Sequence, residues 1–513
     1  MNEAHLRAKM LRGVSWTAIS QVLTQLVTFA TTVILARLLV PADFGVVGMA
    51  ALYTGLVLVL GQIGMGAALI HRQDVSQIEL DTVFWTGLGV ATSVALLSVV
   101  LAPLGGWFFR SALVVTVIRV ASAAYILDAL GAVQRVLMNK EMQFDRLART
   151  EVGAASAYAA VAMGLALAGF GVWAIVLGQL VRSVVEMVLL WWVEPWRPRL
   201  RFSAESFRGL FGFGARVWAF SFVDYARENV DNLAVGRLLG ATQLGFYAFA
   251  YNTANLPRRQ VQNVVGRVTF PAFAKAQNDN VVLRRTYIKV IRYISLIVFP
   301  LQAGLAVVAP QVVPMVYGEK WMAAVVPLQL LCGAQMLYSL GSTVGSVYLA
   351  KGRPDLQLRF GLVALVWLAT VVLVVAHLGI VAVAAGILFY TVGSLLVGQA
   401  LANPLIELRM IDYLKALIPA AVGSATMAAA VTAFRFLTLD SGLIAPVPWV
   451  VSAIALGAAV YVAAVALFRV PEVDEVLGVV GRSLRGLRRE GPADDTALPT
   501  TGPTADPIAD ESL

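Results

Sequence analysis

The sequence predicts an all-α membrane protein with about 14 transmembrane helices in two related bundles around a central cavity. Composition is the first observation, because 59% of the 513 residues are hydrophobic and only 13% are charged, whereas a soluble domain has about 25% charged residues. Second, apolar stretches of about 20 residues, each long enough to cross a bilayer, follow one another along the chain. Third, segment 36–45 returns 200 positions later as segment 236–245, with Arg, Leu, Leu and Gly at matching places. A repeat this long indicates two related halves.

The first half is predicted to be an N-terminal helical bundle of about six spans, residues 1–195. Its spans are mainly apolar runs that are separated by charged residues or by glycine. One apolar run is too long for a single span, so we divide it at Gly169-Phe170-Gly171. The predicted spans are residues 14–38, 45–70, 82–107, 112–134, 149–169 and 172–193.

The second half is predicted to be another bundle of about six spans, residues 196–410, followed by two additional spans within residues 411–470. A second overlong apolar run is divided at His377-Leu378-Gly379. The predicted spans are residues 211–235, 244–266, 287–309, 323–349, 359–377, 379–402, 413–436 and 446–468.

Two segments lie outside these spans. Ser203–Phe213 alternates apolar with charged residues, which predicts an interfacial helix that links the halves. Residues 471–513 are predicted to be a cytoplasmic tail that is largely disordered, because their end is rich in Pro, Asp, Thr and Ala and offers little apolar surface.

Orientation follows from the basic residues, which gather in every second connection between spans. Such connections face the cytoplasm, so both termini are predicted to be cytoplasmic and the number of spans to be even. The net charge of +9 therefore has a topological explanation, and we expect no nucleic-acid partner. The basic connections lie within residues 135–149, 197–208, 258–289, 351–359 and 409–415 and in the tail.

Motifs of common enzymes are missing from the sequence. It contains no nucleophile elbow, no phosphate-binding glycine loop and no Cys/His metal spacing, and its three histidines are widely scattered. The one cysteine, Cys332, cannot form an internal disulfide. We therefore expect no metal, no cofactor and no enzymatic activity, although a membrane enzyme that uses carboxylates alone stays an alternative.

The seventh predicted span carries the densest group of charges. Asp224, Arg227, Glu228 and Asp231 are spaced i, i+3, i+4 and i+7, which places them on one helical face, and Asn232 follows. A charge at the bilayer centre costs roughly 2.5–3.5 kcal/mol, so these residues are expected to face a substrate cavity. The alternative is that Arg227 only neutralises the acids of its own helix. The excess acid would still need a partner or a proton.

Neutral amides and an arginine extend this candidate site. On the eighth predicted span, Asn252 and Asn255 suit sugar hydroxyls and Arg258 suits a phosphate, since a guanidinium binds phosphate bidentately. Arg258 has the alternative of anchoring the helix at the cytoplasmic boundary. Gln21 and Gln25 on the first span are candidates for the same lining, with hydrogen bonding between helices as their alternative.

The first half also has charges inside predicted spans. Arg119 and Asp128 on the fourth span are candidates for substrate contact or for pairing within the bundle. Arg182 and Glu186 on the sixth span are spaced i,i+4, which predicts a local ion pair with a structural role.

Four motifs make the chain resemble a known family. Their order and spacing, across roughly residues 10 to 470, are similar to those of the polysaccharide transporter branch of the multidrug/oligosaccharidyl-lipid/polysaccharide exporter superfamily, and in particular to Wzx-type colanic acid and teichuronic acid exporters. The motifs are Ala36-Arg37-Leu38-Leu39-x-Pro41-x-Asp43-Phe44-Gly45, Asp231-Asn232-Leu233-x-x-Gly236-Arg237-Leu238-Leu239-Gly240, Tyr317-Gly318-Glu319-Lys320-Trp321 and Leu349-Ala350-Lys351-Gly352-Arg353.

The resemblance implies a flippase of the bacterial inner membrane. Its substrate would be undecaprenyl-diphosphate-linked oligosaccharide, moved by alternating access with a coupling proton or sodium ion, and its partners would be the lipid bilayer and polysaccharide polymerase machinery. The matching motifs are fold landmarks, so they transfer no substrate site beyond the presence of Asp231 in one of them. Two other functions stay open: a drug/cation antiporter of the same superfamily and a membrane polysaccharide polymerase.

Overall fold

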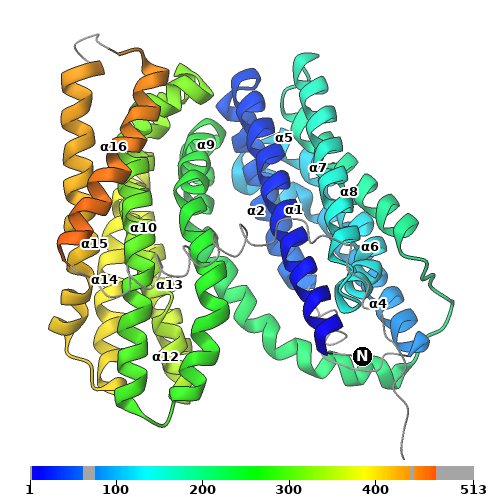
Figure 1. Ribbon diagram of the computed structural model, residues 1–513. Coiled ribbons are helices and arrows are strands. Elements are labelled where there is room, and N and C mark those ends of the chain that lie inside the picture. The colour runs from blue at the N-terminus through cyan, green and yellow to red at the C-terminus, as the bar shows by residue number, and fades with distance from the viewer. Residues whose placement is uncertain (1–2, 62–75, 440–443, 469–513) are drawn as a thin grey trace, which may run out of the picture.

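The structure, a computed structural model, describes residues 3–61, 76–439 and 444–468. Throughout these ranges the secondary structure is helical, without a strand, as the sequence predicts. Figure 1 shows two groups of helices side by side, α1 to α8 in blue and cyan and α9 to α16 in green to orange. We call them the first and the second bundle. The predicted disordered tail, 471–513, lies outside the described residues.

The helices of the first bundle overlap the predicted spans, although α1 begins at Glu3, well before residue 14, and the predicted end of span 45–70 lies outside the described residues. Gly169 and Gly171 have φ values of +82° and +55°, which glycine adopts readily, so the long apolar run is divided where predicted. The predicted span 112–134 is interrupted at Ser122. The helices are α1 (Glu3–Leu38), α2 (Pro41–Gly61), α4 (Gln77–Phe109), α5 (Ala112–Ala121), α6 (Ala123–Lys140), α7 (Phe144–Leu167) and α8 (Val172–Val193).

The second bundle is also divided at the predicted glycine, because Gly379 has a φ of +104° and α14 begins at the next residue. Its α-helices are α9 (Ala204–Ala276), α10 (Asn280–Tyr317), α11 (Val325–Gly341), α12 (Val344–Ala350), α13 (Pro354–Val375), α14 (Ile380–Ala402), α15 (Met410–Phe434) and α16 (Pro446–Leu467). Short 3₁₀ helices, η1 (Glu319–Ala324), η2 (Ala376–Leu378) and η3 (Asn403–Ile406), and a π-helical turn, η4 (Arg435–Leu439), connect them.

Local sequence explains where several helices begin. Pro41 starts α2, where its missing N–H has no helical partner to lose. Before α4, Ser76 and Glu79 form a reciprocal capping box, and before α10 the Asp279 carboxylate accepts hydrogen bonds from two backbone N–H groups of the first turn.

Twelve helical segments in the described part of the chain are long and apolar enough to cross a membrane, and each overlaps one predicted span. The two predicted spans that are not among them, 211–235 and 244–266, both fall within α9. This helix is broken at Gly240, whose φ of +83° and ψ of −177° are not helical, so α9 is a pair of helices. The count of fourteen spans stays a prediction. Residues 204–213 form the first turns of α9, so the predicted linking helix is continuous with the next predicted span, and its interfacial position stays a prediction.

The two repeated segments lie against each other. A Cβ atom built on Gly45 would be 1.8 Å from the carbonyl oxygen of Ala241, and one built on Gly245 would be 1.9 Å from the carbonyl oxygen of Pro41. Backbone therefore meets backbone at both places, which only glycine permits. The motif that recurs in the sequence is the place where the two bundles touch.

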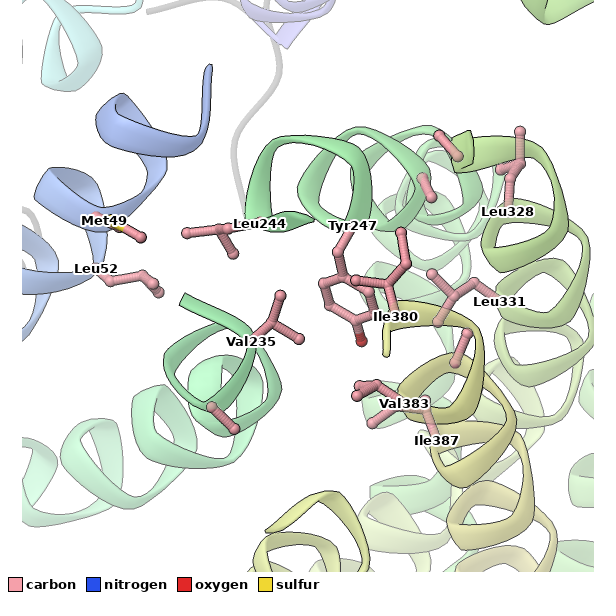
Figure 2. Close-up of a cluster of buried hydrophobic side chains, with 14 of the residues drawn as sticks. Met49, Leu52, Val235, Leu244, Tyr247, Leu328, Leu331, Ile380, Val383 and Ile387 are labelled. Carbon is pink, nitrogen blue, oxygen red and sulfur yellow. The ribbon is translucent and has the colours of Figure 1, made fainter. Parts of the chain in front are cut away.

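Apolar side chains continue this contact into the core. Figure 2 shows Met49 and Leu52 of α2 opposite Val235 and Leu244 of α9, with Tyr247 beside them toward the rest of the second bundle. These residues belong to one buried cluster that extends from α2 through α9 to α11 and α14. Burial of such a cluster stabilises the association of the bundles in this conformation.

A pair of arginines at matching positions of the repeat links the bundles reciprocally. Arg37 of α1 donates to the carbonyl oxygen of Val316, at 2.8 Å, and to that of the residue before it, in the last turn of α10. Arg237 of α9 donates to the carbonyl oxygen of Trp107, at 3.2 Å, and to that of the residue after it, in the last turn of α4. Last-turn carbonyls lack helical donors and attract positive charge. Each half thus caps a helix of the other, and we call these contacts the arginine clasp.

The connection between the bundles is fixed to α4. The backbone N–H of Arg199 donates to Asp81 Oδ1 at 2.9 Å, and that of Ser203 donates to Thr82 Oγ1 at 3.1 Å. Asp81 and Thr82 are fully buried. The segment that leads into α9 therefore starts from a defined place on the first bundle.

Candidate functional site

The candidate site is a cavity of about 410 Å³ inside the second bundle, within the size range of small-molecule sites. It lies between the two parts of α9 and helices α11 to α14. Three of the predicted site residues, Arg227, Glu228 and Arg258, line it. The rest of the wall is mostly apolar, but it also has polar neutral side chains, among them Gln262, Ser342, Thr343, Ser346, Gln357, Thr391 and Ser394. Such a wall offers guanidinium groups, hydroxyls and amides together.

Arg258 is a buried cation that is held by neutral groups. Its side chain is 7% exposed. The Nε and Nη2 atoms donate to Asn255 Oδ1 at 3.0 and 2.7 Å, and Nη1 donates to Gln262 Oε1 at 2.7 Å. Within the described part of the chain no carboxylate forms an ion pair with Arg258. A buried charge without a counter-ion is costly, so an anionic ligand would be stabilised here.

Tyr338 of α11 brings two arginines together. The Cζ atom of Arg258 lies 4.5 Å from the centroid of the Tyr338 ring, and that of Arg227 lies 5.9 Å from the same centroid. Both distances are within the range of cation–π attraction. Sequence reasoning missed this tyrosine, because an aromatic residue inside an apolar run gives no signal of what it contacts.

The acidic members of the predicted site are divided. Glu228 lines the cavity, whereas Asp231 is 2% exposed and is not part of the lining. Asp231 Oδ2 accepts a hydrogen bond from Tyr247 Oη at 2.6 Å, and Oδ1 accepts from the backbone N–H and the side-chain amide of Asn232 at 2.8 and 3.2 Å. Asp231 thereby joins the two parts of α9. The side chain of Asp224 lies outside the described residues.

Other predicted site residues are exposed on the surface of their helices. They are Gln21 and Gln25 of α1, Arg119 of α5 and Asn252 of α9. None of these four lines the cavity of the second bundle or the one described next. Their proposed contact with substrate stays a prediction.

A second cavity of about 730 Å³ lies inside the first bundle and has a mainly apolar wall. Asp128 and Arg135 of α6 are its charged lining residues. Arg135 Nη2 forms an ion pair with Glu186 Oε1 of α8 at 2.6 Å. The predicted local pair between Arg182 and Glu186 is therefore wrong, because Glu186 reaches across to the neighbouring helix.

The two cavities differ at matching positions of the repeat. Leu58 and Arg258 are 200 positions apart, and each lines the cavity of its own bundle. The same place in the duplicated scaffold is apolar in the first half and cationic in the second. At this matching position only the second bundle has a cation, and the arginine of the first cavity, Arg135, is already paired with Glu186.

Two related helical bundles with twelve candidate spans in the described residues and an internal cavity that contains charged side chains define a membrane transporter. The chain belongs to the polysaccharide biosynthesis protein family, whose sequence pattern matches residues 34–326. It is 33% identical over 359 residues to the lipopolysaccharide biosynthesis protein WzxC of Escherichia coli (strain K12), covering 69% of this chain and 73% of that protein. It is 28% identical to the teichuronic acid biosynthesis protein TuaB of Bacillus subtilis (strain 168), covering 68% and 72%. The resemblance inferred from the sequence is confirmed.

Solved structures confirm the fold. The lipid II flippase MurJ, in an inward closed conformation, aligns with a TM-score of 0.69 and 13% identity, covering 88% of this chain and 98% of that one. An inward-facing multidrug resistance transporter of the MATE family aligns with a TM-score of 0.59 and 16% identity, covering 75% and 96%. At these identities the likeness concerns the arrangement of the helices.

Proposed function

We propose that this protein is a flippase that moves undecaprenyl-diphosphate-linked oligosaccharide across the bacterial inner membrane for surface polysaccharide synthesis. The observation that carries the proposal is the buried guanidinium of Arg258 in a cavity whose wall includes amides and hydroxyls. A guanidinium suits the diphosphate, and the neutral polar groups suit the sugars. Membership of the polysaccharide biosynthesis family and the names of WzxC and TuaB support the same substrate class.

The proposed mechanism is alternating access, with both termini in the cytoplasm. The diphosphate and sugars enter the polar cavity, while the polyprenyl chain stays in the lipid. Rocking of the bundles about their contact then exposes the head group on the other side. A proton or a sodium ion is the proposed coupling ion, with Glu228, Asp224 or Asp231 as its acceptor. The polysaccharide polymerase is the proposed next partner.

An ion-coupled drug/cation antiporter is the second candidate. The acids near the cavity would favour it, because an organic cation needs a carboxylate. However, Asp231 already accepts hydrogen bonds from Tyr247 and Asn232, and two arginines contribute to the cavity lining. The positive lining supports an anionic substrate rather than an organic cation.

The test is deletion of the gene, followed by analysis of the lipid-linked oligosaccharides with a membrane-impermeant reagent. We expect cytoplasm-facing intermediate to accumulate and surface polysaccharide to disappear. Wild type should restore both, whereas Arg258→Gln should transport at least about tenfold less, since truncating a buried charged partner costs 2 kcal/mol or more.

Arg259→Gln is the matched control. It removes the same charge from the next residue, which is exposed and does not line the cavity. Equal loss of transport in both variants would show that the cavity has no specific role in transport. Normal polysaccharide and normal sidedness in the deletion strain, without a redundant flippase, would reject the flippase and leave drug efflux as the function to assay.

A further inference from the structure

We propose that Tyr338 is a positioning residue that gathers Arg227 and Arg258 into one site for a diphosphate group in preference to a single phosphate. The inference rests on the proposed function and adds a determinant of its specificity. It concerns a residue of α11, a helix on which the sequence marked no functional side chain. The geometry that points to it is the shared contact of two guanidiniums with one aromatic ring.

The Tyr338 ring contacts both arginines. They come from different parts of α9, 31 positions apart and on opposite sides of the break at Gly240. Both Cζ atoms nevertheless lie within 6 Å of the Tyr338 centroid, at 5.9 and 4.5 Å. Each guanidinium is attracted to the electron-rich face, and the attraction is strongest where water is excluded.

Hydrogen bonds hold one of these guanidiniums, that of Arg258, in place. Asn255 and Gln262 occupy donors on all three nitrogens of Arg258, and each terminal nitrogen keeps one further N–H. The amides therefore fix the plane of the Arg258 guanidinium, and its contact with the Tyr338 ring adds a further constraint on its position. Positions set in this way need little further ordering when a ligand binds.

Charge favours the same ligand. Two guanidiniums that contact one ring add their positive potentials there, and a bound anion is attracted by both. A diphosphate has two phosphoryl groups and can give each guanidinium its own set of oxygen acceptors. A single phosphate has one such group, so it gains less from the second arginine. The preorganised pair therefore selects for the diphosphate.

The experiment measures binding of inorganic pyrophosphate and inorganic phosphate to the purified full-length protein by isothermal titration calorimetry. We expect wild type to prefer pyrophosphate. Tyr338→Leu removes the ring and should weaken pyrophosphate binding about five- to thirtyfold, with less than about a threefold effect on phosphate. Tyr338→Phe keeps the ring and should stay within about twofold of wild type. Phe389→Leu, an exposed aromatic position on α14, is the control for the loss of a ring.

Three results would overturn the inference. They are wild type that binds pyrophosphate no better than phosphate, Tyr338→Leu with unchanged preference, and equal losses in Tyr338→Leu and Tyr338→Phe. Size-exclusion profiles of each variant identify a folding defect, and the Tyr338→Phe variant keeps the test decisive if Tyr338→Leu does not fold. Ring-dependent pyrophosphate binding, together with normal sidedness in the deletion strain, would reject the flippase and retain the diphosphate site.

Discussion

The contact between the repeated segments makes a sharp prediction about Gly45. Replacement by Ala would place a Cβ atom 1.8 Å from the carbonyl oxygen of Ala241 and 2.5 Å from its carbonyl carbon. Ordinary carbon–oxygen contacts are longer by more than about 1 Å, so α2 and α9 would have to separate by that amount. Both atoms that the new methyl meets belong to the backbone, so no side chain can rotate away.

We expect Gly45→Ala to destabilise the protein by about 3 kcal/mol or more. Overpacking of a core costs roughly 1–3 kcal/mol even when side chains can adjust, and separation of the backbones also weakens close Cα–H contacts worth about 0.5–1 kcal/mol each. Gly245→Ala should have an effect of the same size, because its Cβ would lie 1.9 Å from the carbonyl oxygen of Pro41. The two repeats should be equally intolerant.

Gly48→Ala is the control on the same helix. Its Cβ would lie 3.5 Å from a Leu244 side-chain carbon, which is ordinary contact, so the expected change is within about 0.5 kcal/mol. The assay is thermal unfolding of the detergent-purified variants, followed by fluorescence-detected size exclusion. Unfolding of Gly45→Ala at the same temperature as Gly48→Ala would refute the tight contact between the bundles.

Two other predictions concern the arginine clasp and the connection between the bundles. The double variant Arg37→Gln with Arg237→Gln should destabilise the conformation that contains the arginine clasp by about 2 kcal/mol, which reduces its population relative to other conformations roughly thirtyfold. The reason is that hydrogen bonds from charged donors are worth about 1.5–3 kcal/mol. Hydrogen exchange should then quicken in the last turns of α4 and α10, and unchanged exchange would contradict the clasp. Burial raises the pKa of Glu194 and a backbone hydrogen bond from Trp196 offsets it in part, so wild type loses stability as pH rises through this raised pKa. The increase in unfolding temperature caused by Glu194→Gln should therefore be larger at pH 7.5 than at pH 4.5, which is about the pKa of Glu in an unfolded chain. An equal increase at both pH values would show that the carboxyl does not titrate in this range.

Helix positions were predictable because the bilayer imposes length and composition on every span. Both divisions of overlong apolar runs coincide with positive-φ glycines, at Gly169, Gly171 and Gly379, since a short turn between two spans needs a residue that tolerates such backbone angles. Arg227 and Glu228 on the charged face of α9 could be predicted to line a cavity, because charges inside a span must have a polar environment.

Contacts between helices were not predictable from spacing along one helix. Arg182 lies four residues before Glu186 on the same helix, yet the ion-pair partner of Glu186 is Arg135 on another helix. Asp231 shares a helical face with Arg227, yet Tyr247 from the far side of the Gly240 break provides its hydrogen bond. Periodicity reports which face a residue occupies, while packing decides which neighbour that face meets.

The duplication itself separates positions that hold the fold from positions that hold the function. Arg37 and Arg237 are identical and perform the same capping role in opposite directions, so each half depends on the other for a helix end. Leu58 and Arg258 occupy matching places and differ, so at this place only the second bundle offers a cation to a ligand. Where both halves keep the same residue, the requirement is mechanical and applies to both bundles. Where they have diverged, the requirement is chemical and applies to one, which is why the binding residues are found by asking where the repeat is broken rather than where it is kept.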